Sequence, residues 1–249
     1  MASERIVEVE GLVKRFGGLT ALNEVSFNVD EGEIFGLIGP NGAGKTTTLR
    51  ILATLLLPTS GYVRILGYDV VKEASKIREL ISYLAEDAGT YRNLTGYEYL
   101  SIVARIYFKS KRDVEEAVEE AVRISGLGDR IMDKMKTYSR GMKRRIQVAR
   151  ALMTRPKLAI LDEPTAGLDV FHAQHVRDVI KRHVSDGGSV ILSSHNMLEV
   201  EHLCTRLAFI HRGRIIMEGE PEEIKRIYGA SNLEDAFLEV LKRWEGLGL

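Results

Sequence analysis

The sequence has almost no cysteine: Cys204 is the only one in 249 residues. A single thiol cannot form an internal disulfide, so we expect a protein of a reducing compartment. Long apolar runs are also lacking. No stretch approaches the roughly 18 apolar residues that a membrane-spanning helix needs. Residues 1–5 lead into no apolar signal core. These absences predict a chain that neither spans a membrane by itself nor carries a secretory leader.

An excess of charge of one sign is lacking as well. Lys plus Arg number 35 and Asp plus Glu number 35. This balance argues against broad electrostatic binding to nucleic acid, and we expect no nucleic-acid partner. There is no internal repeat and no low-complexity linker. Hydrophobic residues make up 45% of the chain and charged residues 28%. Both values are ordinary for a globular protein that is large enough to bury a full core.

A glycine-rich run is the most informative feature that is present. Residues 39–46, Gly-Pro-Asn-Gly-Ala-Gly-Lys-Thr, fit the phosphate-binding pattern Gly-x4-Gly-Lys-Ser/Thr. Its glycines allow a tight turn that brings backbone N–H groups close to phosphate oxygens. Lys45 adds a mobile positive charge, and the Thr46 hydroxyl can bind Mg²⁺. The alternative is a glycine turn with an incidental lysine. A predicted strand over 33–38 and a predicted helix over 47–52 favour the phosphate loop.

The hydrophobic pattern changes along the chain. Residues 1–30 alternate as antiparallel β structure, and from about 93 to 154 apolar residues recur at helical spacing. The acidic face of this region predicts two ion pairs, Lys111–Glu115 and Glu119–Arg123. Alternation of strands and helices resumes at 157. Further predicted elements are strands at 157–161 and 189–193, a hairpin over 207–217, and helices beginning near 221 and 233.

Three polar residues follow two of the predicted buried strands. Asp162 and Glu163 end one strand, and His195 comes shortly after the other. Carboxylates at the carboxyl end of a parallel strand face the ligand crevice. Asp162 is placed to hold Mg²⁺, Glu163 to polarise an attacking water, and His195 to touch the γ-phosphate or that water. By themselves such acids are more often a solvated strand end. The glycine loop favours the catalytic interpretation.

A helix is predicted over residues 139–153. Ser139 is typical of an N-cap, and a helix N-terminus with a serine and a glycine is suited to binding an anion. From spacing alone, residues 139–153 form a capped amphipathic helix. The basic triplet at 143–145 fits a solvated face and a nucleic-acid patch equally well.

Together these motifs resemble the ATP-binding cassette ATPases of ABC transporters, over essentially the whole chain. Residues 39–46 resemble Walker A, 158–163 Walker B with the catalytic glutamate, and 138–142 the signature. Residues 166–169 resemble the D-loop, and His195 the switch histidine. The resemblance implies an α/β fold, a P-loop NTPase core with an N-terminal antiparallel β subdomain and an inserted helical signature subdomain. The implied division is a core of 1–92 and 155–220, a helical subdomain of 93–154, and C-terminal helices at 221–249.

The resemblance also implies the site residues, with ATP and Mg²⁺ as ligands. Glu163 and His195 would be catalytic, and Thr46, Glu86 and Asp162 would hold the metal. The nucleotide would be bound by the residues Phe16, Gly39, Pro40, Asn41, Gly42, Ala43, Gly44, Lys45, Thr46, Thr47, Ser139, Gly141 and Asp169. Phe16 is at the position where an aromatic ring stacks on adenine, an interaction worth about 1–3 kcal/mol in nucleic-acid sites.

The sequence departs from the family pattern at three positions. Arg140 replaces the first glycine of the signature, and Met142 replaces its glutamine. Glu86 stands where the family has the Q-loop glutamine. Ser139 and Gly141, the expected phosphate contacts, are retained.

In this family the signature of one subunit covers ATP bound to Walker A of another. One copy of each motif therefore implies a dimer, expected to be a homodimer, that hydrolyses ATP and drives a membrane permease. Residues 91–99, Tyr91 to Tyr99, resemble the segment that touches the permease. Residues 92–96 and 233–238 resemble the exporter branch with ABC-2-type permeases. The implied location is cytoplasmic, peripheral on the inner face of the cell membrane. The alternative is a cassette ATPase without a transport role, in iron–sulfur assembly, translation or DNA repair.

Overall fold

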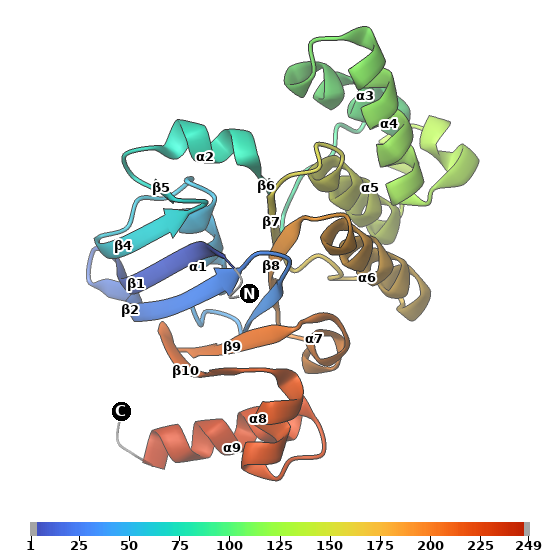
Figure 1. The fold of residues 1–249 in the computed structure, drawn as a ribbon. Helices are drawn as coiled ribbons and strands as arrows, with labels where there is room; N and C mark the ends of the chain where they lie inside the picture. Colours follow the sequence, from blue (N-terminus) through green and yellow to red (C-terminus); the bar gives the residue numbers. More distant parts are fainter. Residues whose placement is uncertain (1–3, 247–249) are drawn as a thin grey trace.

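The computed structural model describes residues 4–246, which form two β-sheets and a set of helices around them (Figure 1). The strands are β1 (Arg5–Phe16), β2 (Leu19–Asp30), β3 (Ile34–Ile38), β4 (Ser60–Ile65), β5 (Tyr68–Asp69), β6 (Ile81–Leu84), β7 (Leu158–Asp162), β8 (Ser189–Ser194), β9 (Arg206–His211) and β10 (Arg214–Gly219). The α-helices are α1 (Lys45–Leu52), α2 (Ala74–Leu80), α3 (Gly96–Tyr107), α4 (Lys111–Ser125), α5 (Arg140–Leu152), α6 (Val170–Ser185), α7 (Met197–Leu203), α8 (Pro221–Tyr228) and α9 (Leu233–Gly246). Two short 3₁₀ helices, η1 (Gly128–Met132) and η2 (Met135–Thr137), precede α5.

The smaller sheet is antiparallel, as the alternation in residues 1–30 predicts. Its strand order is β2-β1-β4-β5. Val9 of β1 pairs with Phe27 of β2 on one side and with Val63 of β4 on the other. All three side chains are buried, because alternate residues of each strand face the same core.

The larger sheet has the order β10-β9-β3-β8-β7-β6, and all its neighbours are parallel except the β9–β10 hairpin. Parallel strands end at a common edge. The glycine loop follows β3, Asp162 ends β7, and His195 follows β8. The topology therefore brings the predicted catalytic segments to one edge of one sheet.

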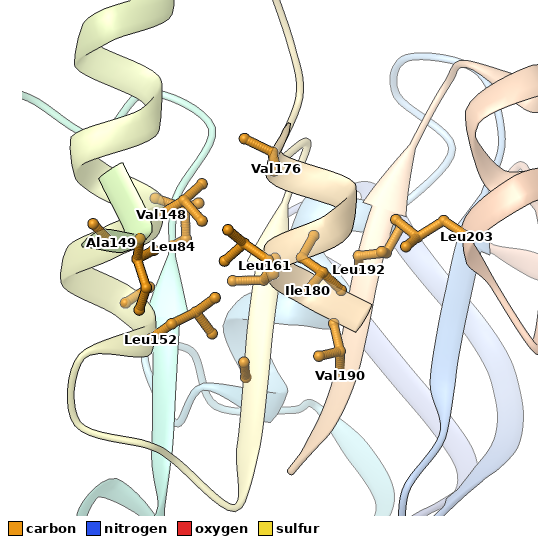
Figure 2. Packing of buried hydrophobic residues seen from close by; sticks show 14 of the residues in the cluster. Leu84, Val148, Ala149, Leu152, Leu161, Val176, Ile180, Val190, Leu192 and Leu203 are labelled. Carbon is orange, nitrogen blue, oxygen red and sulfur yellow. The ribbon is translucent and has the colours of Figure 1, made fainter. Parts of the chain in front are cut away.

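Two cores cover the two faces of this sheet. Phe35 and Leu37 of β3 pack with Leu49 of α1 and with the antiparallel sheet. The opposite face packs against α5 and α6. Figure 2 shows this side, where Leu161 of β7 and Leu192 of β8 lie near the helix residues Val148, Leu152 and Ile180. Burial on both faces explains why β3, β7 and β8 are continuous apolar runs and do not alternate.

The fold class predicted from the sequence is confirmed: an α/β core, an antiparallel β subdomain and a helical part. In Figure 1, α3 and α4 lie apart from both sheets and contact the core side through α5. Helices α2 and α7, seven residues each, were not predicted. None of the helices in residues 4–246 is long and apolar enough to cross a membrane.

One of the two predicted ion pairs is wrong. Lys111 and Glu115 pair at 3.6 Å, as predicted. Arg123 does not pair with Glu119; it binds Glu120, three residues away, through Nε and Nη2. Residues three and four apart are both neighbours on a helix surface, so spacing alone could not choose between the two glutamates.

Candidate active site

The glycine loop connects β3 to α1, and close packing requires two of its glycines, Gly39 and Gly44. A Cβ at Gly39 would lie 2.1 Å from the carbonyl oxygen of Ile210. Gly44 has a φ of 114° and lies against Leu22, so a side chain there would meet both strain and a clash. The sequence identified these glycines correctly as the residues that allow the turn.

Helix α1 begins at Lys45 directly after this loop. Its N-cap is Gly44, and no side chain caps the first turn. The first N–H groups of a helix have no intrahelical acceptor and carry a partial positive charge, so this end of α1 favours an anion. Thr46 and Thr47 lie in the same turn and are half-buried. The local structure thus has the features of a phosphate site.

Lys45 is buried and lies under the loop. Its Nζ donates to the carbonyl oxygen of Gly39 at 2.6 Å and lies 3.7 Å from Oε1 of Glu163. A buried ammonium needs such partners, because desolvation of an unpaired charge is costly. The lysine therefore links the glycine loop to the acidic end of β7.

The two acids at the carboxyl end of β7, Asp162 and Glu163, are held by Ser193 of β8. The Ser193 hydroxyl donates to Oδ1 of Asp162 at 2.5 Å and accepts from the backbone N–H of Glu163 at 2.9 Å. Oδ2 of Asp162 is buried and has no hydrogen-bond partner. Because a buried carboxylate oxygen requires a partner, this atom fits a cation ligand well.

Glu163 lies at the centre of the site. Its side chain is buried, and its φ of 51° is in the left-handed region, which non-glycine residues rarely adopt. Nδ1 of His195 lies 2.9 Å from Oε1 of Glu163. The structure thus brings together the three residues that the sequence placed at the ends of two strands. Backbone outliers of this kind concentrate at functional sites.

A cleft of about 420 Å³ opens above these groups. It is lined by residues from three parts of the chain: Phe16, Leu19 and Ala21 from β1 and β2, Glu86 and Glu163 from the loops after β6 and β7, and Pro40, Asn41, Gly42, Gly44, Lys45, Thr46 and Thr47 from the glycine loop and α1. Phe16 is 47% exposed at the cleft edge, with Nζ of Lys14 4.9 Å from its ring centroid. An exposed ring beside a phosphate loop suits a planar, partly apolar base.

The remaining predicted residues lie outside this cleft. Ser139 caps α5, as predicted, by accepting from the N–H of Met142 at 3.1 Å. Asp169 caps α6, and hydrogen bonds from the His172 backbone and side chain lower its pKa. Ser139, Gly141 and Asp169 do not line the 420 Å³ cleft. Within one chain, the signature segment therefore does not line the cleft of the glycine loop.

Arg140, the unusual signature residue, lies over the D-loop segment of its own chain. A Cβ added at Gly167 would be 2.5 Å from Nε of Arg140, and Gly167 itself has a φ of 74°. A Cβ added at Gly141 would likewise lie 3.3 Å from Cδ2 of Leu168. The start of α5 and residues 167–168 thus form one packed unit.

Arg144 is a site residue that sequence reasoning missed. It belongs to the basic triplet of α5, yet only 4% of it is exposed. Its guanidinium donates to the backbone carbonyls of Glu86, Glu163 and Pro164, among others. Burial lowers the pKa of Arg144 to about 10. Both open interpretations of the triplet therefore fail for its middle residue, which is neither solvated nor available to nucleic acid.

Comparisons with known proteins agree with this geometry. The sequence pattern of the ABC transporter family matches residues 22–166. The daunorubicin/doxorubicin resistance ATP-binding protein DrrA of Streptomyces peucetius is 39% identical over 229 residues, which cover 92% of this chain and 69% of that protein. The lantibiotic transport ATP-binding protein SrtF of Streptococcus pyogenes is 37% identical, and the match covers 93% of this chain and 96% of that one.

Solved structures of ATP-binding cassettes also superimpose on this chain. An ATP-binding subunit of an ABC transporter superimposes with a TM-score of 0.85 and 29% identity, over 95% of this chain and 99% of that one. A dimeric ATP-binding cassette in a post-hydrolysis state, bound to ADP and Pi, matches with a TM-score of 0.78 and 25% identity, over 86% and 98% of the two chains.

Proposed function

The chain belongs to the ABC transporter family. From this premise we propose a role for each residue of the site. As a member it is an ATP-binding and ATP-hydrolysing subunit that acts as a dimer and powers export through a membrane permease. One observation carries the assignment to residues: a single cleft is lined by Phe16, the glycine loop and Glu163. The relatives are named as resistance and transport proteins, which favours export over a role in translation, repair or iron–sulfur assembly.

ATP is the substrate of this cleft. We assign the phosphates to the glycine loop, the first turn of α1 and Lys45, where N–H groups and one ammonium converge. The adenine is assigned to Phe16, whose exposed ring can stack on a base. Glu163 is the general base that accepts a proton from the attacking water. His195, through its 2.9 Å contact, fixes the direction of the Glu163 carboxylate.

The residues present fit a Mg²⁺ ion bound together with the nucleotide. Thr46 supplies a hydroxyl, and Asp162 supplies a buried carboxylate oxygen that has no other partner. Glu86 lines the same cleft. Across residues 4–246 no three or more Asp, Glu, His or Cys residues cluster as a metal site, so phosphate oxygens would complete the coordination. When bound, the ion neutralises phosphate charge.

The signature residues are assigned to the ATP held by a second copy. Ser139 and Gly141 stand at the N-terminus of α5, outside the cleft of their own chain. A helix N-terminus binds anions, so in a dimer this end can cover a neighbour's phosphates. Asp169 belongs to the same unit through Gly167 and Leu168, which pack on the start of α5. We expect two identical chains to form the dimer.

Contact with the permease is assigned to residues 91–99. Tyr91 is 67% exposed and Tyr97 44% exposed, and both lie beside or within α3. Exposed aromatic residues of this kind favour a protein partner. Docking on a permease would hold the chain on the inner face of the membrane. The named relatives concern daunorubicin, linearmycin and a lantibiotic. We infer an exported compound of the same broad antimicrobial class.

We propose that the chain has the three parts that the sequence analysis expects. Residues 1–92 and 155–220 form the ATP-binding core, residues 93–154 the helical subdomain, and residues 221–249 the C-terminal helices. Residues 1–3 and 247–249 of this division lie outside the described part of the chain. The position of α3, α4 and α5 between β6 and β7 supports the middle division.

Co-purification tests the function as a whole. The tagged chain, expressed with its natural neighbours, is recovered from detergent-solubilised membranes. An integral membrane partner that raises its ATPase rate is expected. Recovery of ribosomes or DNA, with no permease, would contradict the assignment to export.

A further inference from the structure

Arg144 joins two loops of the active site through backbone carbonyls alone. From α5, its guanidinium donates to the carbonyl oxygens of Ala85 at 2.9 Å and Glu86 at 3.1 Å. It also donates to those of Glu163 at 2.6 Å and Pro164 at 3.1 Å, and to that of Asp162. The first pair belongs to the loop after β6, Asp162 is the last residue of β7, and Glu163 and Pro164 belong to the loop after β7. Within the described residues, every hydrogen bond of this buried guanidinium therefore goes to a backbone carbonyl.

Arg144 binds the loop after β7 at a residue with an unusual backbone conformation. Glu163 has a φ of 51°, a conformation that only a constraining environment holds in a non-glycine residue. Its N–H donates to the Ser193 hydroxyl, and its carbonyl accepts from Arg144. The peptide groups on both sides of the Glu163 Cα are therefore fixed. The direction of its carboxylate depends on both partners.

The fork geometry of arginine is essential to this arrangement. Arg144 forms no ion pair with a carboxylate within the described part of the chain, although the charges of Asp162, Glu86 and Glu163 raise its pKa against the larger effect of burial. Its donors point in a fixed plane toward carbonyls on two loops. A lysine has a single ammonium on a flexible stem and cannot span both loops in the same way.

We propose that Arg144 is a positioning residue that couples the loop of Glu86 to the catalytic carboxylate of Glu163. The proposal rests on the proposed function, in which Glu163 is the general base. Helix α5 also carries Ser139 and Gly141 at its N-terminus. When α5 moves relative to the second copy of the chain in the dimer, Arg144 therefore moves the loop of Glu86 and the backbone of Glu163 together.

Arg144→Lys in the full-length chain tests this directly. Misplacement of a catalytic group by about 1 Å costs up to about a hundredfold in rate. We expect kcat for ATP to fall by about tenfold to a hundredfold, while KM changes far less. Arg144→Gln, which keeps N–H donors without a buried charge, should show the same split and serves if the lysine variant does not fold.

Arg206→Lys is the matched control. Arg206 is another arginine with many partners, bound to Glu33 and Glu218 at 2.7 Å each. It begins β9 and binds Glu33 just before β3, at the edge of the sheet opposite the glycine loop that follows β3. Its loss should lower thermal stability and leave kcat near the wild-type value. A purely structural role for Arg144 would give the same result as this control, and that outcome would overturn the proposal.

A double-mutant cycle with Glu163→Gln distinguishes the positioning role of Arg144 from the role of Glu163 as the base. If Arg144 acts through Glu163, Arg144→Lys should change single-turnover hydrolysis little in the Glu163→Gln background. An equal loss in both backgrounds would overturn the coupling and leave the base assignment intact. Normal turnover of Glu163→Gln alone would instead refute the base, and with it the proposed function of this residue.

Discussion

Nδ1 of His195 and Oε1 of Glu163 lie 2.9 Å apart at the carboxyl end of the central sheet. The two residues follow different strands, β8 and β7, and meet because these strands are parallel neighbours. The histidine is 57% exposed at its side chain, whereas the glutamate is buried. The contact therefore joins an accessible group to the buried carboxylate that we assign as the base.

His195→Ala should lower kcat with little change in ATP affinity. The substitution removes the partner that orients Glu163 but leaves Phe16 and the glycine loop unchanged, so the loss falls on the chemical step. We expect a fall of about tenfold or more, measured by steady-state phosphate release. His202→Ala, on the exposed face of α7, is the control. Equal rates for the two variants would remove His195 from the site.

Lys45→Ala should weaken nucleotide binding or abolish turnover. The variant deletes the one ammonium that the described residues contribute to the lining of the 420 Å³ cleft. It also leaves the carbonyl of Gly39 and the carboxylate of Glu163 without this donor. Equilibrium binding of labelled ATP and the ATPase rate measure both effects, with exposed Lys72→Ala as control. Normal ATPase activity would contradict the phosphate role of the lysine.

Phe16→Ala should raise the dissociation constant for ATP and leave kcat at saturation nearly unchanged. Loss of a stacking contact worth about 1–3 kcal/mol corresponds to about a 5- to 150-fold weaker affinity. Phe16→Tyr keeps the ring and should bind ATP normally. Titration calorimetry with ATP checks this. An unchanged affinity of the alanine variant would place the adenine elsewhere.

Much of this site was predictable because its residues are adjacent in sequence to recognisable elements. The glycine loop, Asp162, Glu163 and His195 each follow a short apolar run that is typical of a buried strand. Parallel strands end together, so their side chains had to converge. The overall α/β organisation followed from the same periodicities.

The rest depends on tertiary contacts that no local pattern encodes. Arg144 lies in a basic triplet, and only the packing of α5 against the loops after β6 and β7 makes it a buried donor. Helix α2 escaped prediction because Ile77 is its only buried residue, so it has almost no apolar periodicity. The choice of Glu120 over Glu119 by Arg123 is likewise a matter of side-chain geometry.

The stability of the fold should depend on pH through His183 of α6. Burial lowers its pKa below the ordinary 6.5, although Asp186 acts in the opposite direction. A depressed histidine pKa means that the unfolded chain binds the proton more readily. The stability it supports is complete above pH 6.5 and is lost as pH falls through the folded value.

His183→Gln should therefore flatten the dependence of the unfolding free energy on pH below 6.5. Each unit of pKa difference contributes about 1.4 kcal/mol. Urea unfolding between about pH 7.5 and pH 5 measures the two slopes. Parallel curves for the wild type and the variant would show that His183 does not control this loss.

The most direct measurement is the turnover of Glu163→Gln with Mg-ATP. The substitution keeps the shape of the side chain and the hydrogen bonds of its backbone, but an amide cannot accept the proton of the attacking water. General-base catalysis typically contributes about 10²- to 10⁴-fold. We expect ATP to bind, hydrolysis to slow by about that factor, and an ATP-bound dimer to accumulate. ATP turnover at the wild-type rate would contradict the assignment of Glu163 as the base.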